Sequence, residues 1–93
     1  MSEANTVDCG NRLSIDQAEA LYEKLETALL TGGDVVLDGT DVQYSDTAGF
    51  QMIISLRKTL ESTGNSIRWQ AVSENMKEIA GYLGLQQALN LPD

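Results

Sequence analysis

The 93-residue chain has no histidine and a single cysteine, Cys9. Ser-His and Cys-His catalytic arrangements and zinc sites therefore have nothing to be built from, and an internal disulfide is excluded. No Gly-rich loop is followed by the Lys and Ser/Thr that would cradle a phosphate, so no nucleotide cofactor is predicted. We therefore expect no hydrolase of familiar design and no cofactor.

Basic residues are also scarce, with 6 Lys and Arg against 14 Asp and Glu and a formal net charge of -8. Nucleic acid and anionic lipid surfaces attract positive charge and are poor partners for such a chain, whereas a basic protein surface suits it. No apolar run approaches the ~20 residues that span a membrane, and residues 1–7 lack the features of a signal peptide. We expect a cytoplasmic protein without membrane insertion.

Length and composition predict one globular domain over residues 1–93, because 42% of the residues are hydrophobic and only one is proline. Near the N-terminus, residues 6–9 and 12–14 predict two short strands that form a hairpin around Gly10-Asn11, although all of residues 1–13 is open to assignment as strand or hairpin. A capping-box pattern at Ser14 and apolar residues at helical spacing then predict a helix over 15–30.

In the rest of the chain, strands alternate with helices. The apolar run in residues 34–38 predicts a buried strand that is central in its sheet, and the alternating pattern of 66–72 predicts a strand nearer an edge. A second helix is predicted to begin at residues 46–49 and to run to about Thr63. A third is predicted to begin after Ser73 and to end at Gly84. This α/β alternation implies a sheet backed by helices.

The most informative segment is Asp46-Thr47-Ala48-Gly49, between the central strand and the helix that follows. Asp46 is predicted to cap that helix, and Thr47 then occupies its first position with an exposed hydroxyl. A phosphate there would gain from the free N–H groups and the helix dipole, although the Asp46 charge opposes it. Ala48 and Gly49 either admit the backbone of a partner or serve as packing spacers within the protein.

Two further patterns surround this segment. Asp38, Asp41 and Asp46 lie near one strand end and could gather a magnesium ion, but solvated loops and a helix cap explain them more simply.

The helix that follows Asp46 also carries two apolar stripes, the second made by Phe50 and Ile54. A helix packed on one side needs only one stripe, so we expect exposed apolar area beside the segment, which marks a protein interface.

The order of these elements resembles the STAS domain. The resemblance runs over roughly residues 34–89, from Val35-Val36-Leu37-Asp38 through the Asp46 to Gly49 segment and the strand 67–72 to Leu83-Gly84-Leu85. It implies a mixed four- to five-stranded sheet with helices mainly on one face, and a role in binding protein partners rather than in catalysis.

The resemblance leaves three roles open. Anti-sigma factor antagonists bind a switch kinase, the anti-sigma factor, which turns them off by phosphorylating the serine directly before the glycine; here that position is Ala48, so Thr47 would have to accept the phosphate. A second branch has Asp-Thr, a small residue and glycine: the cytosolic subunit of a bacterial phospholipid ABC transporter, whose threonine contacts the ATPase. A third is a stand-alone protein of a chemotaxis or signalling cluster.

We therefore expect a bacterial regulatory domain that docks a protein partner through the corner at the start of the second helix and through the exposed side of that helix. Thr47 is the candidate for phosphorylation. The expected contact residues are Tyr44, Ser45, Asp46, Thr47, Ala48, Gly49 and Phe50.

Overall fold

The computed structural model describes residues 5–91. Its strands are β1 (Asn5–Asp8), β2 (Arg12–Leu13), β3 (Val35–Gly39), β4 (Tyr44–Ser45) and β5 (Ile67–Val72), and its helices are the 3-10 turn η1 (Ile15–Gln17), α1 (Ala18–Thr31), α2 (Thr47–Glu61) and α3 (Glu74–Leu83). The three predicted α-helices are confirmed. The first begins as a 3-10 turn, and the second ends before Thr63.

The five strands form two sheets, a three-stranded one in the order β1-β3-β5 and a two-stranded one that pairs β2 with β4. All pairs among these strands are parallel, so the expectation of a mixed sheet is wrong for the described residues. A crossover helix separates β1 from β3 and β3 from β5, and such connections return the chain in a parallel direction. The predicted central place of β3 and edge place of β5 are confirmed.

Two short strands lie near the N-terminus, as predicted, but the expectation that they form a hairpin is wrong. Residues 5–8 pair with β3 and residues 12–13 with β4, so the two segments lie in different sheets. The Cys9 N–H still donates to the Asp38 carbonyl oxygen, at 3.0 Å, before Gly10 at φ +73° redirects the chain. Val7 and Cys9 are buried, and pairing β1 with the apolar β3 places them in the core, which a two-stranded hairpin could not provide.

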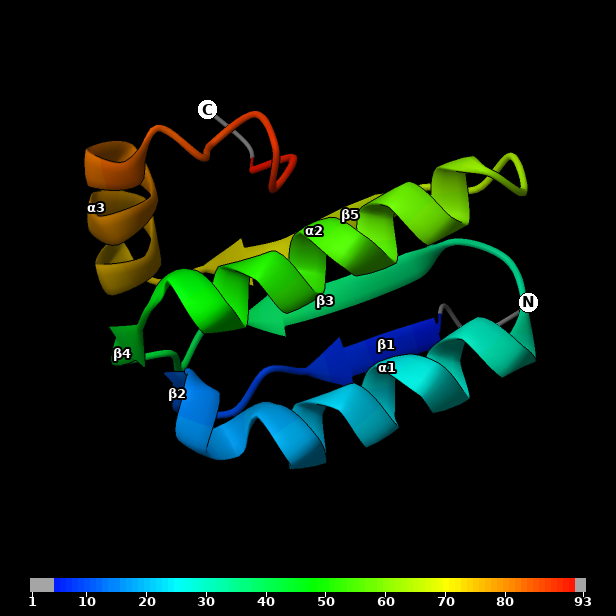
Figure 1. The fold of residues 1–93 in the computed structure, drawn as a ribbon, viewed down its shortest axis with the longest axis horizontal. Helices are drawn as coiled ribbons and strands as arrows, with labels where there is room; N and C mark the ends of the chain where they lie inside the picture. The colour runs from blue at the N-terminus through cyan, green and yellow to red at the C-terminus, as the bar shows by residue number, and fades with distance from the viewer. Residues whose placement is uncertain (1–4, 92–93) are drawn as a thin grey trace.

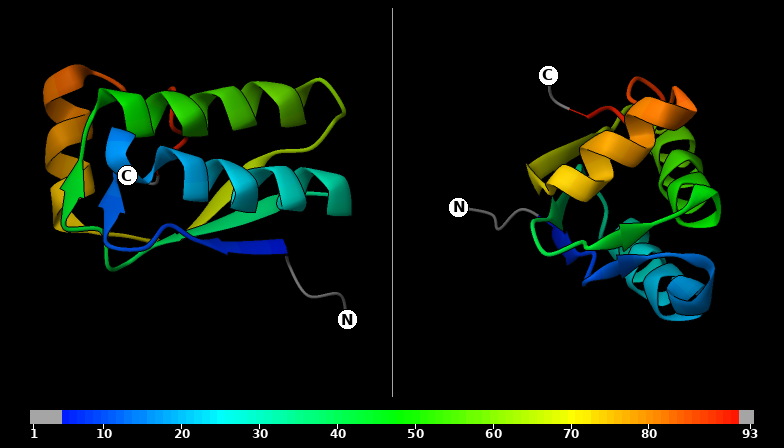
Figure 2. Two further views of the ribbon diagram at one scale, coloured as in Figure 1. Left: turned by 60° about the horizontal axis from the view of Figure 1, so that its bottom comes forward. Right: turned by 90° about the vertical axis from the view of Figure 1, so that its left-hand side faces the viewer.

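Helices α1 and α2 lie side by side over one face of the three-stranded sheet, and α3 lies across one end of it (Figures 1 and 2). The expectation of helices mainly on one face is therefore met. Along α1 the buried residues are Leu21, Leu25 and Ala28, and the inward residues of β3 are Val35 and Leu37. Among the described residues, no helix is long and apolar enough to cross a membrane.

The residues after α3 fold back along α2 and β5. The Arg57 guanidinium on α2 donates to the Ala88 carbonyl oxygen at 3.3 Å. The Trp69 indole N–H on β5 donates to the Leu89 carbonyl oxygen at 2.8 Å. Leu89 is fully buried. This C-terminal segment, residues 85–91, therefore covers a side of α2 that neither α1 nor the sheet covers.

The second apolar stripe of α2 is buried in the structure. Phe50 is 0% exposed and Ile54 is 7% exposed, so the expectation of exposed apolar area from this stripe is wrong. A helix that packs against α1 on one side and a C-terminal segment on another needs two apolar stripes. The apolar surface beside the Asp46 segment comes from other elements.

Candidate functional site

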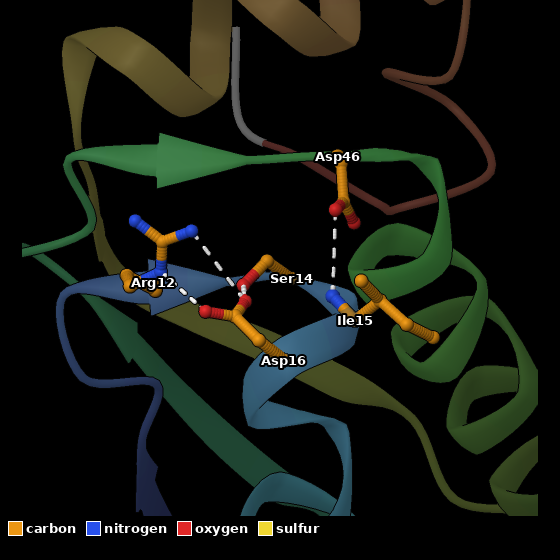
Figure 3. A network of polar contacts seen from close by, with 5 residues as sticks. All are labelled: Arg12, Ser14, Ile15, Asp16 and Asp46. Atoms are coloured by element: carbon orange, nitrogen blue, oxygen red, sulfur yellow. Dashed lines mark hydrogen bonds and ion pairs between the residues drawn. The ribbon is translucent and has the colours of Figure 1, made fainter.

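Asp46 is the N-cap of α2, as predicted, and its carboxylate joins two elements. Oδ1 accepts from the Gly49 N–H at 2.9 Å, and Oδ2 accepts from the Ile15 N–H of η1 at 3.4 Å (Figure 3). The Asp46 N–H in turn donates to the Leu13 carbonyl oxygen at 3.1 Å. One side chain thus satisfies backbone donors at the start of both η1 and α2, and this fixes how β2 meets α2.

Gly49 is a packing spacer within the protein. A Cβ atom at this position would lie 2.0 Å from the carbonyl oxygen of Leu13 and 2.9 Å from the backbone nitrogen of Ser14. The backbone that approaches Gly49 is therefore that of the chain itself, at the end of β2. This decides between the two roles that the sequence left open for Gly49.

Thr47 is the first residue of α2 and its side chain is exposed, whereas the neighbouring Ala48 is partly buried. Within residues 5–91, the structure gives the Thr47 hydroxyl no hydrogen-bond partner. The Gly49 N–H, which could otherwise contribute to an anion site, is already bonded to Asp46. Thr47 therefore offers a free hydroxyl to a partner beside a negative charge.

Tyr44 and Ser45 form β4 but play different parts. Tyr44 is 44% exposed, and the guanidinium carbon of Arg12 lies 4.4 Å from the centre of its ring, a cation–π arrangement. Ser45 is buried, and its hydroxyl donates to Oδ1 of Asn75 on α3 at 2.7 Å. Ser45 thus anchors β4 to α3, while Tyr44 remains available for contact.

The predicted contact residues therefore divide into two groups. Tyr44, Asp46, Thr47 and Ala48 reach the surface, at least in part, and Ser45, Gly49 and Phe50 are buried beneath them. The buried group shapes the corner from within.

Ile15 is a surface residue of this corner that the sequence interpretation missed. It is 68% exposed and its backbone is bonded to Asp46, which places an apolar side chain next to the start of α2. The signal was available, because Ile15 does not belong to the Leu21, Leu25 and Ala28 repeat that packs on the sheet.

Arg12 was missed as well, and it belongs to a polar network on the same side (Figure 3). Its Nε lies 3.1 Å from Oδ2 of Asp16, and the hydroxyl of Ser14 donates to Oδ1 of the same carboxylate. The Ser14 hydrogen bond, followed by the contacts with Arg12, lowers the pKa of Asp16 below its ordinary value. The network holds Arg12 over Tyr44.

The acidic residues considered for a magnesium ion do not converge. Asp38 accepts from the Thr40 hydroxyl at 2.5 Å and from the Thr40 N–H at 3.0 Å, which lowers its pKa. Asp46 is occupied in capping α2. Among residues 5–91, no three His, Cys, Asp or Glu side chains are grouped so that they could hold a metal ion.

Two comparisons with known proteins bear on the family of the chain. A family model described as "Mlab, STAS domain" matches residues 2–92, nearly the whole chain. None of the curated proteins matches the chain. The match covers all the described strands and helices, together with the Asp46 to Gly49 corner, and the chain therefore belongs to the STAS domain family.

Proposed function

We propose that this protein is a single, non-enzymatic docking domain that binds a protein partner through the α2 corner, the surface formed by Ile15, Tyr44, Asp46, Thr47 and Ala48. STAS domains generally act through protein–protein interaction. The observation that carries the proposal is the exposed Thr47 hydroxyl, which follows Asp46 directly, the residue whose carboxylate bonds the backbone of the exposed Ile15. Large apolar side chains around a polar contact are typical of interface centres.

Several internal contacts hold the frame beneath this surface, which favours binding. Asp46 ties α2 to η1, Gly49 packs on the backbone of Leu13, and Ser45 anchors β4 to α3. A surface held in one conformation before binding loses little conformational entropy when the partner arrives.

As the partner we propose the ATPase subunit of a phospholipid transporter, in the cytoplasm. Two observations support this choice: the matching family model carries the Mlab description, and the corner has Asp46-Thr47 followed by a small residue and glycine. Ala48 has no hydroxyl, so the position that carries the phosphate in anti-sigma factor antagonists is not available as a switch. In this role Thr47 is a permanent contact that keeps the ATPase active.

Co-purification with the ATPase and measurement of ATP hydrolysis test this role. Thr47→Ala is expected to lower hydrolysis by the complex without unfolding the small domain. The matched control is Thr31→Ala, the exposed last residue of α1, which should behave as wild type because this end of α1 lies away from the start of α2 (Figure 1). A Thr47→Ala complex that assembles and hydrolyses ATP at the wild-type rate would refute the role.

A second candidate function is that of an anti-sigma factor antagonist controlled by phosphorylation of Thr47. The free hydroxyl of Thr47 at a helix N-terminus favours it. A phosphate would add a charge of about -1.5 to -2 to a contact surface beside Asp46 and would release the partner. A stand-alone protein of a signalling cluster would use the same corner with another partner.

Incubation with the cognate switch kinase and ATP, followed by intact-mass measurement, tests the switch. We expect a single phosphate on the wild type and none on Thr47→Ala, with Thr31→Ala modified like the wild type. Modification of Thr47→Ala to the same extent would place the phosphate elsewhere and reject this function.

A further inference from the structure

The exposed side of the helical layer carries a groove that is separate from the α2 corner. It has a volume of about 290 Å³ and is lined by Tyr22, Leu25 and Leu29 of α1 and by Met52, Ser55 and Leu56 of α2. Tyr22 is 57% exposed, and Leu29 and Met52 are partly buried. Helices α1 and α2 lie side by side (Figures 1 and 2), and residues of both helices line the groove. Its lining is mainly apolar, and no described element covers it.

Helix α1 carries a stripe of acidic residues next to the residues that line the groove. Glu19, Glu23 and Glu26 follow one another at intervals of four and three residues and so form one stripe, and Glu19 and Glu26 are helical neighbours of Tyr22. All three are exposed, and none makes an ion pair within residues 5–91. Like charges at this spacing repel one another in the free protein.

The α2 wall adds little that opposes this charge. Lys58, three residues after Ser55, is the basic residue beside the groove on that helix, since Arg57 is paired with Glu61 at 3.0 Å. Three carboxylates on α1 and one ammonium group on α2, none of them in an ion pair within residues 5–91, therefore lie on the helices that form the groove. A second copy of the chain would bring the same acidic stripe and a net charge of -8 into contact, which is unfavourable.

We propose that this groove docks a basic amphipathic helix of a protein partner, with its apolar face against Tyr22, Leu29 and Met52 and its Lys or Arg side chains against Glu19, Glu23 and Glu26. The groove between two helices supplies the apolar seat that such a segment needs, and the acidic stripe selects its charge. This second surface does not depend on Thr47, so it stands or falls separately from the proposed function.

The probe is a synthetic Leu/Lys amphipathic helix of roughly five turns, compared with a matched peptide in which every Lys is Glu, by fluorescence anisotropy with the full chain. The Lys peptide is expected to bind and the Glu peptide is not. Ser55→Arg fills the groove from an exposed position and should weaken binding about tenfold, whereas Gln87→Arg adds the same charge outside the groove and should have little effect. Circular dichroism checks that each variant is folded.

A separate variant tests whether the glutamates of α1 contribute to binding of the Lys peptide. Glu23→Gln combined with Glu26→Gln should weaken binding about threefold at low salt and reduce its salt dependence, while Glu78→Gln on α3 and Thr47→Ala should leave it unchanged. Equal affinity of Ser55→Arg and wild type, or equal binding of the two peptides, would overturn the proposal. So would a wild-type dimer that Ser55→Arg dissociates in sedimentation experiments, since the occupant would then be a second copy.

Discussion

The backbone of Leu13 lies so close to Gly49 that a Cβ atom on Gly49 would come within 2.0 Å of the Leu13 carbonyl oxygen. The contact joins the end of β2 to the first turn of α2, and α2 carries Thr47 and Ala48 of the α2 corner. Because the neighbour is backbone rather than a flexible side chain, the two elements would have to separate to admit a larger residue.

Gly49→Ala is therefore expected to destabilise the protein by about 3 kcal/mol, the upper part of the usual range for overpacking. Gly81→Ala is the matched control, because a Cβ there meets no atom closer than 3.5 Å and Gly81 lies within α3. That variant should gain about 0.5 to 1 kcal/mol from helix propensity. Urea unfolding of both variants measures the difference, and a Gly49→Ala protein as stable as wild type would contradict the close approach.

Asp46 gives a second prediction, because it caps α2 and also bonds η1. Asp46→Ala removes both hydrogen bonds and should cost about 1 to 2 kcal/mol in thermal or urea unfolding. Asp46→Asn keeps an oxygen for the Gly49 N–H and should cost clearly less. Equal losses in the two variants would show that the charge, and not the cap, is what stabilises this corner.

The Ser14 and Asp16 contact predicts a selective change in titration. The Ser14 hydroxyl is the main cause of the lowered pKa of Asp16, so Ser14→Ala should raise that pKa toward its ordinary value of 3.8. Asp38, whose pKa is lowered by Thr40, should titrate as before. Carboxyl ¹³C chemical shifts against pH measure both groups in one experiment.

The sign of the stability effect follows from the direction of this pKa shift. A carboxylate whose pKa is lowered by folding stabilises the folded state above its unfolded pKa, and this contribution is lost as the pH falls through the folded pKa. The loss for Asp16 therefore lies below pH 3.8 and should be smaller in Ser14→Ala. An unchanged Asp16 pKa in that variant would contradict the hydrogen bond.

Cys9 provides a further test, since it is the single thiol of the chain. Burial, followed by the charges of Asp8 and Asp38, raises its pKa to about 12 from an ordinary 9.0. The native protein should react with a thiol reagent at pH 8 far more slowly than the urea-unfolded protein, and stability should fall as the pH rises from about 9 to about 12. Rapid labelling of native protein would place Cys9 outside the core.

The features that could be predicted from the sequence are those decided by neighbouring residues. Asp46 and Ser73 each precede a helix, and their side chains accept hydrogen bonds from the N–H groups of Gly49 and Met76. Helix capping of this kind involves residues within one turn, so the local sequence predicts it. The start of α2, the position of Thr47 and the glycine at the end of α3 all follow from such local signals.

The features that escaped prediction depend on residues far apart in the sequence. Gly10 permits a turn, but whether β1 then pairs with β2 or β3 depends on which partner buries Val7. The two-residue strand β4 is too short for a periodic pattern to show. Phe50 looked like surface, but α2 also meets a segment more than thirty residues later in the chain, where Arg57 donates to the Ala88 carbonyl oxygen.

The parallel order β1-β3-β5 also bears on how the protein acquires its structure during synthesis. Residue 5 pairs with residue 35, and residue 35 with residue 67, so each ladder closes only after about thirty further residues have been made. Pairings of such high sequence separation form slowly, because the entropy of closing a long loop is lost before any contact repays it. The α2 corner becomes a finished surface only when α3 follows and Asn75 receives the Ser45 hydrogen bond. A ribosome-bound fragment that ends before residue 75 should therefore be unable to bind the partner.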